Sequence, residues 1–265
     1  MRAYVTYMFL AVCVVMQVMA APEALVPARA MHGGAAFVRK LYEGEPVTIV
    51  TLGTSLTGGD WRWPDVMMHD WLNKEFPGQV TFKNLGVGGS ASSHPQGRCG
   101  LDRVNQAVRF KPDVVFIEFA VNDSYLPYAI SLEAAKTNLN SMIDTILNAN
   151  PETEIILQTM NPVMDNLGTG ASGVKKRGLG PHATNRPGLA EYMQGYRDVA
   201  KQRALLLVDH YPNWLKVMNE NPELFDKLVP DRIHPRVEGY RMVLLPELRK
   251  TLMPVFGDAV ENGEE

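Results

Sequence analysis

Three residues of this sequence could together activate an oxygen nucleophile: a serine, a histidine and an aspartate. Ser55 follows the first strand-like run, whereas Asp231 and His234 stand three residues apart near the end of the chain. Hydrolysis of an ester at neutral pH needs a deprotonated hydroxyl, an imidazole that takes its proton, and a carboxylate that holds the imidazole in the right tautomer. Each residue also has an ordinary role, since Ser55 could cap a turn and His234 could be a buried structural histidine. The interpretation depends on where the fold puts them.

The composition of the chain is that of a globular protein. The 265 residues are 46% hydrophobic and carry a net charge of −3, with charges of both signs interspersed. This is enough apolar sequence for one large domain or two small ones, and it offers no basic face for nucleic acid. The histidines lack His-x-His and His-Glu-x-x-His spacing, so we expect no metal ion and no other cofactor.

The first residues differ from the rest of the chain. An apolar stretch from Tyr4 to Ala21 follows Arg2 and ends in small residues before Pro22. We therefore expect residues 1–20 to be a signal peptide and the protein to be exported, to the periplasm or outside the cell, without stable membrane contact after cleavage. The alternative is an uncleaved membrane anchor, since the stretch is nearly long enough to span a bilayer. Cleavage would leave Cys99 as the only cysteine, so no intrachain disulfide is expected.

Strand-like and helix-like runs alternate through the rest of the chain. Five short runs rich in β-branched and apolar residues predict buried strands, at residues 47–52, 80–84, 113–118, 154–159 and 205–209. Helical spacing or helix-start signals follow them, at residues 64–76, 104–110, 132–146, 189–203 and from 236 onward. Strands that alternate with helices form a parallel sheet covered on both faces. The sequence thus predicts an α/β fold, a three-layer α/β/α sandwich around a five-stranded parallel sheet.

The same pattern divides the chain into segments. Residues 21–45 are expected to be a tether, residues 46–256 a single domain and residues 257–265 an acidic tail. A Gly-rich stretch from Asn161 to Gly188 interrupts the alternation, and it could be a mobile lid, a subsite wall or a solvated loop.

The candidate residues fall at the carboxyl ends of the expected strands. Ser55 follows the first strand, Gly89 the second and Asn122 the third. Asp231 and His234 precede the last helix, on the same rim. Ligands of open parallel sheets bind at this edge, where the strand order reverses. Ordinary turn and capping roles would require several independent coincidences on one rim, so we favour a catalytic site.

The motifs of this chain resemble those of the SGNH or GDSL-type serine hydrolases. Four short blocks come in the family's order, and they are Gly53-Thr54-Ser55, Asn84 to Gly89, Val121-Asn122-Asp123 and Asp231 to His234. The resemblance covers residues 47–252. It departs from the family's pattern at two positions, because Thr54 stands where the family name has Asp, and Ala120 stands where the third block often has Gly.

The resemblance implies a fold, a reaction and a set of roles. The fold would be the flavodoxin-like SGNH sandwich, and the reaction would be hydrolysis of carboxylic esters. Ser55, His234 and Asp231 would form the catalytic triad. The Ser55 amide, the Gly89 amide and the Asn122 side chain would form the oxyanion hole, since donors aimed at the developing charge are usually the largest catalytic term.

The substrate follows less directly. Trp61 and Trp63 come after the nucleophile segment and Tyr125 comes after Asn122, so we expect aromatic rings at the pocket rim, where sugars or acyl chains stack. Export and the resemblance favour the removal of short acyl groups, O-acetyl above all, from a glycan or a small ester. The alternatives are a lipase or lysophospholipase, and a catalytically silent carbohydrate-binding protein on the same fold.

Overall fold

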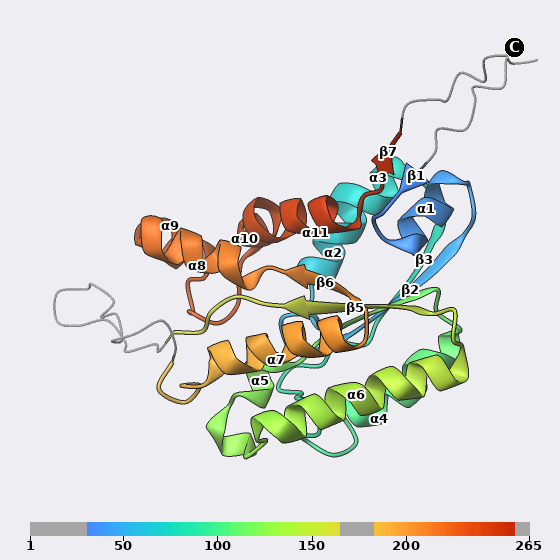
Figure 1. Cartoon of the computed structure of the whole chain (residues 1–265). Coiled ribbons are helices and arrows are strands. Elements are labelled where there is room, and N and C mark those ends of the chain that lie inside the picture. The colour runs from blue at the N-terminus through green and yellow to red at the C-terminus, as the bar shows by residue number, and fades with distance from the viewer. Residues whose placement is uncertain (1–30, 165–182, 258–265) are drawn as a thin grey trace, which may run out of the picture.

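A five-stranded parallel sheet lies at the centre of the protein, in a computed structural model that describes residues 31–164 and 183–257 (Figure 1). Its strands are β2 (Val47–Gly53), β3 (Val80–Asn84), β4 (Val114–Glu118), β5 (Glu154–Thr159) and β6 (Leu206–Asp209). They lie in the order β3-β2-β4-β5-β6, each parallel to its neighbours. This is the flavodoxin-like order, so the predicted fold class is confirmed.

Helices cover both faces of the sheet (Figure 1). One face carries α4 (Gly100–Ala107), α6 (Leu132–Ala149) and α7 (Leu189–Gln202), with the short η2 (Val108–Phe110), α5 (Ala120–Asp123) and η3 (Leu126–Tyr128) between them. The other face carries α1 (Ala36–Tyr42), α2 (Trp63–Met67), η1 (Met68–Leu72), α3 (Asn73–Glu75), α8 (Tyr211–Glu220), α9 (Pro222–Leu228), α10 (Val237–Gly239), η4 (Tyr240–Leu244) and α11 (Leu245–Leu252). No helix in the described part of the chain is long and apolar enough to cross a membrane.

Helix α6 shows how local sequence and packing agree. The Ser131 hydroxyl caps its first turn by accepting a hydrogen bond from the Ala134 amide, at 3.1 Å. Its buried residues recur at intervals of three and four, which places them on the face toward the sheet, and they are Ala135, Leu139, Met142, Ile143 and Ile146. Strand β4 in the middle of the sheet is buried along its whole length, so the core lies between these two layers.

The expected tether needs correction from residue 31 onward. Strand β1 (Met31–His32) pairs antiparallel with β7 (Val255–Phe256), and α1 packs its inner face into the core. The amides of Ala36 and Phe37 at the start of α1 donate to the Glu154 carboxylate, at 2.9 and 3.0 Å. Orphan amides of a helix amino terminus need such acceptors, so the chain from residue 31 belongs to the domain. The expected signal peptide, residues 165–182 of the Gly-rich stretch and residues 258–265 of the tail lie outside the described residues.

Candidate active site

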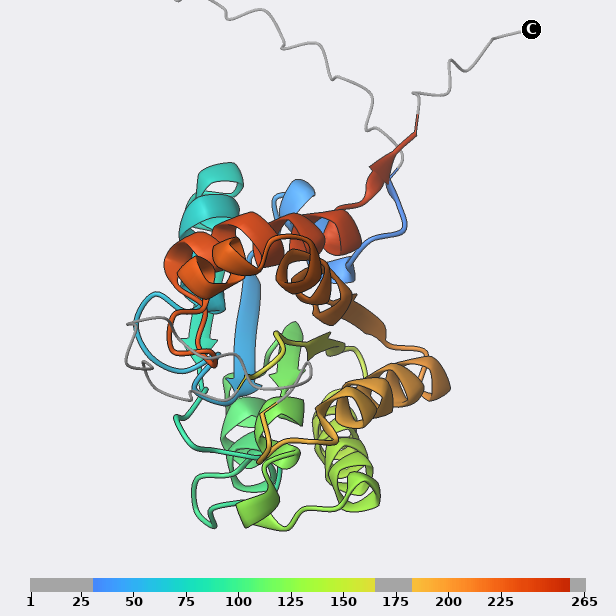
Figure 2. The same ribbon diagram turned by 90° about the vertical axis from the view of Figure 1, so that its left-hand side faces the viewer.

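The structure brings Ser55, His234 and Asp231 together at the carboxyl edge of the sheet, which faces the viewer in Figure 2. The Ser55 hydroxyl oxygen lies 2.8 Å from Nε2 of His234. The other ring nitrogen, Nδ1, lies 2.7 Å from the Asp231 Oδ2 oxygen. Ser55 is in the turn after β2, whereas the other two residues lie between α9 and α10. The three side chains therefore form one hydrogen-bonded series across two distant segments.

A tight turn holds the Asp231 carboxylate against the imidazole. Its second oxygen accepts the backbone amides of Ile233 and His234, at 2.9 and 2.7 Å. Arg232 between them adopts a left-handed backbone with φ of 65°, which lets the chain fold back so closely. Partial burial raises the pKa of Asp231, but the hydrogen bonds from the His234 ring and the two amides outweigh it and lower the pKa below its ordinary value. The carboxylate is therefore ionised at neutral pH.

A second carboxylate lies buried beneath the turn that carries Ser55. Oε1 of Glu118, the last residue of β4, accepts the Thr54 amide at 2.7 Å, the Thr57 hydroxyl at 2.6 Å and the Thr54 hydroxyl at 3.0 Å. Burial raises the pKa of Glu118 to about 7, against the opposing effect of these hydrogen bonds. A Cβ at Gly53 would overlap this carboxylate and the Thr57 hydroxyl, so only glycine fits there. Glu118 thus anchors both ends of the serine turn.

The role of Glu118 was not predicted from the sequence, although a signal was present. It is the one charged residue of a strand whose other members are apolar, Val114 to Ile117. A carboxylate at the end of a buried strand requires hydrogen-bond donors. Thr54 and Thr57, which flank Ser55 at the end of the neighbouring strand, are candidates for these donors.

The loop after β3 places a second candidate oxyanion donor, the Gly89 amide, near the Ser55 amide in the turn after β2. A Cβ on Gly88 would stand 3.9 Å from the Ser55 Cβ, which places this loop beside the serine. Gly89 has φ of 71°, and its carbonyl accepts the Tyr128 hydroxyl at 2.8 Å. Within the described residues, the Ser55 and Gly89 amides donate no hydrogen bond. Both amides are therefore available to a bound oxygen.

The Asn122 side chain reaches the same loop from α5. It is 7% exposed, and its Nδ2 donates to the Ser90 carbonyl at 2.9 Å. An amide NH2 has two hydrogens, so one remains for a ligand. On its other side, the Asn122 Oδ1 oxygen lies 3.3 Å from Nη2 of Arg186, a residue that sequence analysis missed because its contact spans 64 positions.

The three aromatic residues expected at the rim have different surroundings. Trp61 is 49% exposed, with its ring 5.3 Å from that of His69. Tyr125 is half-buried, with a guanidinium above its ring. Trp63 is a correction, because it is fully buried and its indole N–H donates to the Thr57 hydroxyl at 3.0 Å. Trp63 begins α2, whose buried face packs on the sheet, so it supports the serine turn from inside.

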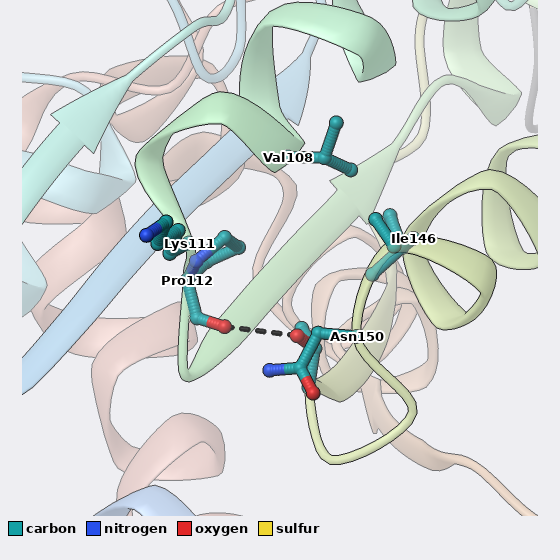
Figure 3. Close-up of a pocket in the computed structure, with 7 residues that line it drawn as sticks. Val108, Lys111, Pro112, Ile146 and Asn150 are labelled. Carbon is teal, nitrogen blue, oxygen red and sulfur yellow. Dashed lines mark hydrogen bonds between the residues drawn. The ribbon is translucent and has the colours of Figure 1, made fainter.

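A groove of about 560 Å3 runs along the His234 side of the site. Trp61 lines this groove together with five charged side chains, those of Asp60, Arg62, Asp231, Arg236 and Glu238. A second hollow of about 250 Å3 lies at the amino ends of β4 and β5, lined by Lys111, Pro112 and the end of α6 (Figure 3). That hollow is at the edge of the sheet opposite to Ser55. Among the described residues, no cluster of three or more His, Cys, Asp or Glu side chains could hold a metal ion.

The fold and this geometry define the class of protein. A flavodoxin-like sheet carrying a serine, histidine and aspartate at its carboxyl edge is the arrangement of the SGNH hydrolase fold. Residues 51–242 match the GDSL-like lipase/acylhydrolase family. The chain therefore belongs to this family and is a GDSL-type hydrolase.

Solved structures of related enzymes share the fold. A lipase/acylhydrolase from Enterococcus faecalis is 24% identical, with 80% of this chain and 100% of that chain covered and a TM-score of 0.57. An acetyl-xylooligosaccharide esterase from Geobacillus stearothermophilus is 21% identical, with 78% and 94% covered and a TM-score of 0.57. An acetyl xylan esterase, AlAXEase, is 18% identical, with 78% and 100% covered and a TM-score of 0.60. No curated protein matches the sequence.

Proposed function

We propose that this protein is an exported serine esterase that removes short acyl groups, O-acetyl above all, from carbohydrate. The observation that carries the proposal is the hydrogen-bonded series from the Ser55 hydroxyl through the His234 ring to the Asp231 carboxylate, with links of 2.8 and 2.7 Å. This contact pattern suits general-base activation of a serine.

The reaction proceeds in two halves. The Ser55 oxygen attacks the ester carbonyl carbon while Nε2 of His234 takes the hydroxyl proton, and the same nitrogen then gives that proton to the departing alcohol. Water next attacks the acyl-serine while Nε2 of His234 takes its proton, and the same nitrogen returns that proton to the Ser55 oxygen as its bond to the acyl group breaks and the acid leaves. Asp231 holds the imidazole in the tautomer with its proton on Nδ1 and stabilises the imidazolium that forms.

The oxyanion is stabilised by donors from three segments, the turn after β2, the loop after β3 and helix α5. Negative charge develops on the carbonyl oxygen in both halves of the reaction, and a preorganised donor there contributes roughly a hundred- to a thousand-fold in rate. These donors are the amides of Ser55 and Gly89, which donate to no other described residue, and the second Nδ2 hydrogen of Asn122.

The groove beside His234 favours a polar leaving group over a long acyl chain. A lipase needs a continuous apolar channel, since each buried methylene contributes about 0.8 kcal/mol only where apolar walls receive it. Half of the residues that line this groove are charged, and they stand among one exposed indole, that of Trp61, and the apolar Pro230, Pro235 and Val237. Such a mixture suits a sugar, whose hydroxyls pair with charged groups and whose ring stacks on an aromatic face.

The test measures kcat/KM for p-nitrophenyl esters of increasing chain length and acetate release from acetylated glycans. We expect the highest kcat/KM for acetate, a steep decline toward octanoate, and acetate release from at least one glycan. Ser55→Ala is expected to keep the fold and lose nearly all activity. A maximum at eight carbons with no acetate release would support the lipase alternative, and glycan binding without turnover in the wild type would support the silent binding protein.

A further inference from the structure

A buried arginine lies directly behind the candidate oxyanion donor Asn122. Arg186 is 7% exposed and comes just before α7, in a segment tied to the loop after α5 by the Leu126 amide, which donates to the Asn185 carbonyl at 3.0 Å. Its guanidinium lies 4.5 Å from the centre of the Tyr125 ring. The side chain is thus clamped in one position beside α5.

Within the described residues, each nitrogen of this guanidinium donates one hydrogen bond to an uncharged acceptor. Nε donates to the Val121 carbonyl at 2.8 Å, Nη1 to the Asn185 side-chain oxygen at 3.1 Å and Nη2 to the Asn122 Oδ1 at 3.3 Å. Within the described part of the chain, no carboxylate forms an ion pair with Arg186. Burial lowers its pKa, yet a guanidinium stays protonated in proteins. Among the residues that the structure describes, nothing neutralises this buried cation, which is costly and calls for a reason.

The orientation of the Asn122 amide supplies the reason. Its Nδ2 donates to the Ser90 carbonyl while its Oδ1 faces Arg186. If the amide turned over, its NH2 group would face the donors of Arg186 and its oxygen would face a carbonyl. Arg186 therefore locks Asn122 with its NH2 group toward the loop that lies beside Ser55.

We propose that Arg186 is a positioning residue for the oxyanion hole, acting through the Asn122 amide. It fixes the direction of the Nδ2 hydrogens, and its charge polarises the amide so that Nδ2 becomes a stronger donor, as linked hydrogen bonds reinforce one another at low dielectric. This inference rests on the proposed esterase function. It adds to that function a residue that touches neither the nucleophile nor the substrate carbonyl.

The test is a double-mutant cycle on p-nitrophenyl acetate hydrolysis with Arg186→Met, Asn122→Ala and the two combined. We expect Arg186→Met to lower kcat about tenfold to a hundredfold, with KM changed less than twofold, because the lost interaction acts in the transition state. In the Asn122→Ala background the same substitution is expected to cost less than twofold. Arg186→Lys keeps a cationic donor and is expected to recover part of kcat.

Arg203 provides a matched control, because its Nη1 also donates to an asparagine Oδ1, that of Asn140, at 3.0 Å, on the outside of α6. Arg203→Met is expected to leave kcat within twofold. If Arg186→Met does not fold, judged by circular dichroism and thermal unfolding, Arg186→Gln replaces it in the cycle with the same expectation.

The outcomes separate this inference from the proposed function. An unchanged kcat in Arg186→Met, or an equal loss with and without Asn122, would overturn the positioning role. Loss of activity in Ser55→Ala together with full activity in Asn122→Ala would remove the premise and overturn it as well, while leaving the serine mechanism intact. Full activity in a folded Ser55→Ala protein would instead refute the esterase mechanism itself.

Discussion

Replacing Glu118 with glutamine tests whether the carboxylate under the serine turn titrates in the folded protein. Glutamine keeps an oxygen that can accept the Thr54 and Thr57 hydrogen bonds, which are 2.7 and 2.6 Å long in the wild type. It removes the ionisation and puts an NH2 group in place of Oε2, which accepts the Thr54 hydroxyl at 3.3 Å in the wild type. The Glu118 carboxyl is fully buried, and burial raises its pKa from 4.5 to about 7.

The sign and size of the expected effect follow from proton linkage. Between pH 4.5 and 7 the folded protein holds a proton on Glu118 that the unfolded chain has lost, so stability falls as pH rises through this window. The difference of about 2.5 pKa units is worth about 3 kcal/mol, at about 1.4 kcal/mol per unit. Roughly 1 kcal/mol of that change falls between pH 6 and 8.

Other buried groups make the comparison with the variant necessary. Burial raises the pKa of Asp123 to about 7 and lowers that of His210 to about 3. His210 therefore stabilises the fold increasingly as pH rises toward its unfolded pKa, opposite in sign to the two carboxyls. Both groups titrate in wild type and variant, so the difference between the two proteins removes most of their effect.

The assay is urea unfolding of wild type and Glu118→Gln at several pH values from 4.5 to 8. We expect the wild type to lose about 3 kcal/mol relative to the variant across this range. Glu133→Gln, on the exposed side of α6 with its side chain 80% exposed, is the control and is expected to give no such trend. A constant difference between wild type and Glu118→Gln would refute the reasoning, because it would mean that three donors hold Glu118 ionised throughout.

Three further substitutions address the site itself. Asp231→Asn is expected to lower kcat by on the order of a thousandfold or more. This loss is expected to be smaller than that of His234→Ala, because the imidazole can still act when its orientation is only loosened. Single-turnover kinetics of both variants test which loss is larger, with the exposed Asp198→Asn as control. Trp61→Ala is expected to raise KM about twofold to tenfold for an acetylated oligosaccharide but to leave p-nitrophenyl acetate unchanged, because an aromatic platform contributes about 0.5–1.5 kcal/mol to a stacked ring. Met242→Ala, at a side chain that is 56% exposed, is its control, and equal effects on both substrates would contradict a sugar-binding role.

Buried parallel strands were the most predictable part of the fold. Residues 154–159 form a strand with the predicted bounds that is buried at every position after the first, because a strand covered on both faces reads as one apolar run. Residues 80–84 also have the predicted bounds, but they form an edge strand in which half-buried and exposed residues alternate. The parallel order then put Ser55, Gly89 and Asn122 on one edge. The expected tether was wrong from residue 31 onward, since α1 has only seven residues and its contacts with the domain include a partner more than a hundred positions away.

Local sequence could not decide which way individual side chains point. Trp61 and Trp63 are two residues apart, yet one is exposed and the other lies in the core against Phe116, with ring centres 5.5 Å apart. Trp63 is buried because it begins α2, which packs on the core, whereas Trp61 precedes the helix. Both residues are close to Ser55 in the sequence, so this closeness does not predict their burial. Arg186 and Glu118 escaped notice because their partners lie 64 or about 60 positions away.

The site joins a buried half to an exposed half. The serine turn rests on Glu118, Thr57 and Trp63, all fully buried, whereas the carboxylate of Asp231 is 50% exposed. The Tyr240 hydroxyl, from η4, donates to the Leu56 carbonyl at 3.4 Å and links the two halves across 184 positions. The distance between Ser55 and His234 therefore depends on how η4 and α11 pack on α2. Core substitutions there are expected to change turnover before they unfold the protein, because the contact between serine and imidazole needs the two halves in register.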